Sequence, residues 1–228
     1  MLVAFEITHR CNKYCPHCSH KIKTSNYDYL TLEDYKILTL KILPKQITEL
    51  RLIGGEPLMH PHFKELITSI KKDYTGIVIS ISTNGRLIPK FEKELENCII
   101  YLTHYPGWND DIIKKYKDKP NVIISNKSKF WDTDVKEPLS YSEGCTASSN
   151  CPFKSVRFVG LKQYDCCMAE SIEREKLDQR VYLQIHNNWI GCRGFLPTAY
   201  ACQWCFRAVS YIKKSSWDPP ATLNHDSK

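Results

Sequence analysis

Residues 2–18 read LVAFEITHRCNKYCPHC, and this stretch decides the fold class. Leu2–Thr8 is a short apolar run of strand-favouring residues, and three cysteines follow it, at positions 11, 15 and 18. A strand that ends at a cysteine-bearing loop predicts a ligand site at the carboxyl end of that strand. Thiolates are ligands of both iron–sulfur clusters and zinc.

After the cysteines, strand-like and helix-like segments alternate as far as residue 126. Thr31-Leu-Glu-Asp34 resembles a helix-capping box, while Pro61 and Gly76 can start and stop the next helix. Including the first strand, the pattern predicts strands at 2–8, 47–53, 77–81, 98–103 and 122–125, and further helices at 89–97 and 110–117. Five strand-then-helix repeats imply an α/β protein whose parallel sheet is either open or curled into a partial barrel.

Chemically distinctive residues follow three of these strands. Cys11 comes after the first, Gly54-Gly55-Glu56 after the second and Asn84 after the third. Because the carboxyl ends of parallel strands meet at one edge of the sheet, we expect these three motifs to converge in space.

The composition is that of a globular protein. The 228 residues include 42% hydrophobic and 25% charged residues, and the net charge of +7 is spread over scattered lysines. A solvated lysine-rich surface is the favoured explanation of this positive balance, which otherwise slightly favours an anionic substrate. The opening apolar stretch is interrupted at Glu6, which argues against a signal peptide, and no stretch predicts a membrane span. Eleven cysteines without an export signal indicate metal-binding thiols in the cytoplasm.

Two kinds of metal site fit the first cysteines. A tetrahedral zinc site can draw on Cys15, Cys18, His17 and His20. A [4Fe–4S] cluster with only three cysteine ligands leaves one iron open, which a catalytic cluster requires.

The three motifs together resemble the radical SAM superfamily. They are Cys11/Cys15/Cys18 in CxxxCxxC spacing, Gly54-Gly-Glu-Pro57 and Ser82-Thr-Asn-Gly85, and the resemblance covers residues 2–126. It implies a partial (β/α)6 TIM-like barrel in which the three cysteines bind a [4Fe–4S] cluster whose fourth iron chelates S-adenosylmethionine (SAM). It further implies reductive cleavage of SAM to a 5′-deoxyadenosyl radical that abstracts a hydrogen from the substrate, driven by a one-electron reductant of the flavodoxin or ferredoxin type.

The resemblance also assigns contacts to SAM. His17 would pack near the adenine, and Ser82 and Asn84 would contact the ribose and carboxylate. The methionyl ammonium would be received by Gly54, Gly55 and Glu56. His104 or Tyr105 could line the same pocket, or serve only in the structure. The family's glycine motif on the fifth strand is not evident in residues 122–126.

Seven cysteines lie between residues 144 and 206. They surround a predicted β-hairpin, residues 156–159 and 163–166, in an order that resembles the auxiliary-cluster extensions called SPASM and twitch domains. That resemblance implies a second [4Fe–4S] cluster held by Cys151, Cys166, Cys202 and Cys205. Cys145 could replace Cys151, Cys167 could replace Cys166, and zinc is again the alternative. Cys192 could be a fifth ligand, a hydrogen-atom donor or inert, and Cys98 is expected to be a buried structural thiol.

The expected organisation is a radical SAM barrel at 1–143, an auxiliary-cluster region with a cysteine-rich hairpin at 144–212 and a disordered tail at 213–228. The substrate is left open between a peptide or amino-acid type and a nucleoside, sugar or nucleic-acid type. A zinc-bound nucleic-acid adaptor without catalysis is the alternative function.

Overall fold

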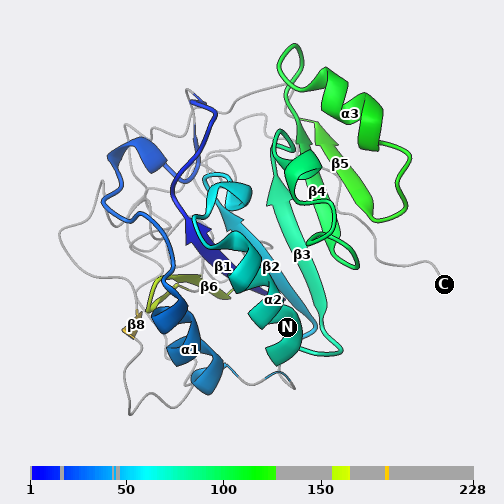
Figure 1. Cartoon of the computed structure of the whole chain (residues 1–228). Coiled ribbons are helices and arrows are strands. Elements are labelled where there is room, and N and C mark those ends of the chain that lie inside the picture. Colours follow the sequence, from blue (N-terminus) through cyan, green and yellow to red (C-terminus); the bar gives the residue numbers. More distant parts are fainter. Residues whose placement is uncertain are drawn as a thin grey trace, which may run out of the picture.

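One mixed sheet organises the chain (Figure 1). The computed structural model describes residues 2–15, 18–42, 44, 47–126, 156–164 and 183–184. Within these residues the strand order is β5-β4-β3-β2-β1-β6-β7-β8. The strands are β1 (Leu2–Thr8), β2 (Glu49–Gly54), β3 (Val78–Thr83), β4 (Ile99–His104), β5 (Val122–Asn126), β6 (Val156–Val159), β7 (Lys162–Tyr164) and β8 (Leu183–Gln184).

The predicted parallel sheet is confirmed. Every neighbouring pair from β5 across to β6 is parallel, and only the pairs β6–β7 and β7–β8 are antiparallel. The bounds of the first five strands all agree with the predicted segments to within two residues. The helices are α1 (Leu32–Lys41), α2 (Phe63–Asp73) and α3 (Asp110–Tyr116), with 3-10 turns η1 (Ile22–Thr24), η3 (Pro57–Met59) and η4 (Ile88–Lys90).

The helix predicted at 89–97 is wrong. The segment forms the 3-10 turn η4 and then irregular turns, with a single i→i+4 bond from the Leu95 N–H to the Phe91 carbonyl at 3.0 Å. Pro89 occupies the first turn, and Asn97 takes a left-handed φ of 62° that ends the segment. The buried side chains of Phe91 and Leu95 anchor this looser turn in the core.

The predicted hairpin forms as β6 and β7, with Gly160 at a φ of 55° in its turn. Its first strand also joins the main sheet, since β6 pairs in parallel with β1, from Val3 opposite Val156 to Glu6 opposite Val159. The sequence did not predict this pairing. Residues 127–155, the C-terminal cysteines and the predicted tail lie outside the described residues, so the domain boundaries stay a prediction.

The two faces of the sheet differ in polarity. Register partners Phe5, Leu52, Ile81, Ile100 and Phe158 form the apolar face. Phe5 contacts Phe158 and Tyr74, with ring centroids 5.7 and 6.5 Å apart, and so joins the strands to the end of α2. The opposite face carries Glu6, Arg51, Ser80, Tyr101 and Arg157. In the parallel part of the sheet, polar side chains therefore gather on one face and at the carboxyl ends of the strands.

No helix in the described part of the chain is long and apolar enough to cross a membrane.

Candidate functional site

The loop after β1 carries Cys11, Cys15 and Cys18, all as reduced, half-buried thiols. The chain turns back at Lys21, whose left-handed φ of 46° lets its N–H donate to the Cys18 carbonyl at 3.0 Å. It then returns along β1, where the Leu30 N–H donates to the Ile7 carbonyl at 2.8 Å. The cysteine loop is thus a closed excursion from the end of β1.

The three thiols are close enough to interact electrostatically. Burial raises the pKa of Cys11 to about 11, and negative charge on Glu56, Cys15 or Cys18 raises it further. The Lys13 N–H, 3.4 Å from the Cys11 sulfur, opposes this rise. A thiolate in this position therefore needs a cation beside it, which a coordinated metal supplies because metal-bound thiols lose their proton.

Gly54 and Gly55 bring the end of β2 against the cysteine loop. A Cβ on Gly55 would lie 2.5 Å from the Arg10 carbonyl oxygen, and one on Gly54 would collide with the Thr8 carbonyl. The Gly55 N–H donates to Thr8 O at 2.7 Å, and the Glu56 N–H donates to Arg10 O at 2.8 Å. The absence of a side chain thus serves a close backbone approach, here between two segments of the protein itself.

The Glu56 carboxylate is fully buried and joins β2 to β3. It accepts hydrogen bonds from the Thr83 hydroxyl at 2.6 Å, the Asn84 N–H at 2.8 Å and the Leu58 N–H at 3.2 Å. Burial raises its pKa to about 7, although these donors act in the opposite direction. The carboxylate faces the end of β3 in this structure.

Asn84 completes the convergence. Its side-chain amide donates to the Asn12 Oδ1 at 2.7 Å, which connects the end of β3 directly to the cysteine loop. Its buried carbonyl accepts from the Asn109 amide at 2.8 Å. The predicted meeting of the three motifs at one sheet edge is therefore confirmed.

The remaining predicted residues are placed as follows. Ser82 is half-buried on β3, opposite Tyr101 of β4 in register. Cys98 is buried in the core, as expected. His17, Cys145, Cys151, Cys166, Cys167, Cys192, Cys202 and Cys205 lie outside the described residues.

The end of β4 adds aromatic residues, some of which the sequence did not single out. Tyr105 lies beside the cysteine loop, and its pKa is raised by burial first and then by Cys15. Lys13 lies over the rings of Tyr105 and Trp108, at 4.8 and 4.4 Å from their centroids. His104 pairs instead with Asp110 at 2.6 Å. Trp108 was not predicted. The sequence signal that could have indicated it is the turn Tyr105-Pro-Gly-Trp108, which directly follows a predicted strand.

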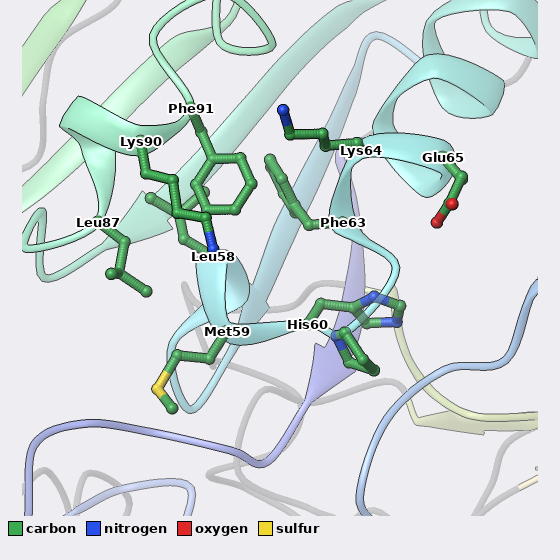
Figure 2. Close-up of a pocket in the computed structure, with 10 residues that line it drawn as sticks. Leu58, Met59, His60, Phe63, Lys64, Glu65, Leu87, Lys90 and Phe91 are labelled. Carbon is green, nitrogen blue, oxygen red and sulfur yellow. The ribbon is translucent and has the colours of Figure 1, made fainter.

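A separate pocket of about 410 Å³ lies between η3, α2 and η4. Figure 2 shows Phe63 and Phe91 side by side in its wall, where their rings pack edge to face with centroids 5.0 Å apart. None of the cysteines or other predicted site residues lines it.

Comparison with known proteins identifies the family. The family model of the radical SAM superfamily matches residues 5–122, which include all three motifs. The chain belongs to the radical SAM superfamily. Membership of this superfamily makes it an enzyme by class.

Curated relatives of this radical SAM protein match part of its chain. The GTP 3′,8-cyclase of Nitrobacter hamburgensis is 34% identical over 97 residues, which are 40% of this chain and 28% of that protein. The GTP 3′,8-cyclase of Campylobacter jejuni subsp. doylei is 32% identical over 98 residues, 40% and 30% of the two chains. The match thus spans less than a third of the length of these relatives.

Two crystal structures of BtrN resemble the whole fold. The complex with AdoMet and 2-DOIA aligns with a TM-score of 0.57 and 15% identity, over 93% of this chain and 85% of BtrN. The open conformation aligns with a TM-score of 0.52 and 15% identity, over 93% and 83%. At this identity the likeness shows the fold alone.

The donor set of the radical SAM protein fits a three-cysteine [4Fe–4S] cluster. Three reduced thiols lie on one loop, they interact through their charges, and the Gly-Gly backbone and Asn84 brace the loop. Within the described ranges, no three His, Cys, Asp or Glu side chains are grouped as ligands of a single metal ion.

Proposed function

We propose that this enzyme binds a [4Fe–4S] cluster through Cys11, Cys15 and Cys18 and uses SAM to abstract a hydrogen atom from its substrate. The observation that carries the proposal is the meeting of the loop that bears the three thiols with the Gly54-Gly55-Glu56 segment and Asn84 at the carboxyl edge of a parallel sheet. When bound, the cluster and SAM supply the reductive C–S cleavage that yields methionine and a 5′-deoxyadenosyl radical.

The protein's own residues hold and shield this chemistry. Gly55 and Glu56 fix the start of the loop, just before Cys11, through backbone bonds to Thr8 and Arg10. Asn84 and Ser82 lie at the end of β3, where they can contact the ribose and carboxylate of SAM. His17, which lies outside the described residues, is proposed to pack near the adenine. Tyr105 and Trp108 close one side of the loop and exclude water from it.

The C-terminal cysteines are proposed to hold an auxiliary [4Fe–4S] cluster through Cys151, Cys166, Cys202 and Cys205. The β6–β7 hairpin between the first two of them supports this arrangement. A one-electron donor of the flavodoxin or ferredoxin type, in the cytoplasm, would deliver the electron.

The substrate is proposed to be of the nucleoside or sugar type, with a peptide type as the alternative. The names of the curated relatives refer to GTP, and the net charge of +7 suits an anionic substrate. Transfer of deuterium from a labelled candidate substrate into 5′-deoxyadenosine would identify the class.

Anaerobic purification tests the proposal. The wild-type protein should be brown, bleach with dithionite and convert SAM to 5′-deoxyadenosine. The triple variant Cys11→Ala/Cys15→Ala/Cys18→Ala should lose this activity while it keeps the iron of the auxiliary cluster. A colourless wild-type protein with stoichiometric zinc would contradict the proposal and favour the zinc-bound adaptor.

A further inference from the structure

A buried charged cluster lies directly beneath the cysteine loop. Glu6 of β1 and Arg157 of β6 are both fully buried, and His9 is 6% exposed. His20, the fourth member, is half-buried. None of these contacts belongs to the SAM contacts described above.

A single carboxylate oxygen holds both ends of the loop. Glu6 Oε1 lies 3.0 Å from His9 Nε2 and 2.7 Å from His20 Nδ1. His9 precedes Cys11 by two residues, and His20 follows Cys18 by two residues. The three cysteines are therefore enclosed between two histidines that lie against one carboxylate oxygen, His20 through a hydrogen bond and His9 through an ion-pair contact.

The other carboxylate oxygen connects the loop to a distant part of the chain. Glu6 Oε2 forms an ion pair with Arg157 Nη2, and the same nitrogen lies 3.1 Å from His20 Nδ1. Tyr27 adds a further tie, since its hydroxyl donates to the Glu6 carbonyl at 3.0 Å and its ring packs on His9 at 4.9 Å.

Because these side chains lie in the protein interior, each charged member of the group depends on its partners. An uncompensated carboxylate in the interior is costly, so Glu6 requires Arg157. The hydrogen bond to His20 and the ion-pair contact with His9 in turn require Glu6 to be in place. Arg157 comes from β6, whose position in the sheet depends on its pairing with β1.

We propose that Glu6 is a positioning residue for the cluster, because it brings the two ends of the cysteine loop together. Since Glu6 is paired with Arg157, this effect also depends on the position of strand β6. The inference rests on the proposed function, because it assumes that the loop holds a [4Fe–4S] cluster. Side chains that support the residues around metal ligands fix the geometry of those ligands and retard metal loss.

Paired variants test the role without leaving a buried charge. Glu6→Leu/Arg157→Met replaces the ion pair with apolar side chains, a change that protein interiors often tolerate. Glu6→Gln/Arg157→Met keeps an amide oxygen as acceptor for the histidines. We expect the Leu variant to release iron to a chelator about 10- to 100-fold faster than wild type and to show an altered EPR spectrum of the reduced, SAM-bound cluster. The Gln variant should recover most of both properties.

Controls separate positioning from general damage. Far-UV circular dichroism should be unchanged in both double variants, and His62→Asn, a change at an exposed histidine outside the loop, should behave as wild type. Should the Leu variant fail to fold, His20→Ala removes one tie at a half-buried position and should give a smaller acceleration of iron release.

The outcomes are distinct. Wild-type rates and spectra in the Leu variant and in His20→Ala would overturn the inference, and so would equally fast iron loss from the Leu and Gln variants. A wild-type protein that holds no cluster would instead overturn the proposed function, and the inference with it.

Discussion

Gly55 shows how much one missing side chain decides at this site. The β2 end and the cysteine loop approach so closely that two loop carbonyls occupy the space of a Cβ, those of Arg10 at 2.5 Å and His9 at 2.8 Å. Both obstacles are backbone atoms, which cannot move aside as the end of a flexible side chain can.

Gly55→Ala should therefore lower the free energy of unfolding by more than the matched change Gly76→Ala. Gly76 has a φ of 82° but nothing within 4 Å of its virtual Cβ, so alanine there costs only the backbone term of about 1 kcal/mol. Urea unfolding of the two variants gives the comparison, and iron content after reconstitution reports on the loop. Equal stability of the two variants would mean that the close approach is not maintained in solution.

Glu56 makes stability depend on pH at the same site. Its pKa rises from 4.5 to about 7 on folding, so between these values the folded state binds more protons than the unfolded state, and stability falls as the pH rises. The loss saturates above pH 7, at about 3 kcal/mol between pH 4.5 and pH 8.

Glu56→Gln should remove this loss. Its free energy of unfolding should fall less than that of wild type between pH 5 and pH 8, as measured by urea unfolding at both values. Glu65→Gln is the matched control, since the Glu65 side chain is 64% exposed. An unchanged pH slope in Glu56→Gln would show that Glu56 does not titrate in this window.

At the scale of the element, α1 begins with the cap that its sequence indicates. The Asp34 N–H donates to the Thr31 hydroxyl oxygen at 3.0 Å, which satisfies one of the free amides of the first turn. Glu33 and Asp34 add negative charge near the helix N-terminus.

Thr31→Ala should destabilise the protein by about 1 kcal/mol, because the first turn loses its acceptor. Thr31→Ser should retain nearly all of the stability. Thr68→Ala, a threonine change on the exposed side of α2, provides the comparison in thermal unfolding. A loss equal to that of Thr68→Ala would show that the cap contributes nothing.

For the whole molecule, the decisive feature is that β6 completes the sheet beside β1. Phe158 is 2% exposed and packs on Phe5, which in turn contacts Tyr74 at the end of α2. The hairpin strand thus contributes to the same core as the first strand.

Phe158→Ala should cost about 3–5 kcal/mol and should increase hydrogen exchange in β1 as well as in β6. Hydrogen-exchange mass spectrometry of the intact chain measures both effects. Leu40→Ala, at a side chain 77% exposed, should leave both strands protected. Unchanged protection of β1 in Phe158→Ala would indicate that the hairpin folds as an independent unit.

Three features could be predicted from the sequence alone: the alternation of strands and helices, the cap of α1 and the convergence of three motifs at one sheet edge. These features follow from local periodicity, local hydrogen bonds and the geometry common to all parallel sheets. The family of the protein was readable for the same reason, since Cys11, Gly54 and Asn84 each follow a strand that the pattern predicts.

The contacts between residues that are far apart along the chain became known only from the folded structure. It placed β6 against β1, buried Arg157 on Glu6, turned the Glu56 carboxylate toward Thr83, and brought Trp108 to Lys13. No local pattern predicts these pairings, because a buried polar group pairs with whichever partner the folded sheet brings within reach. That partner can lie more than a hundred residues away along the chain, as Arg157 does from His20.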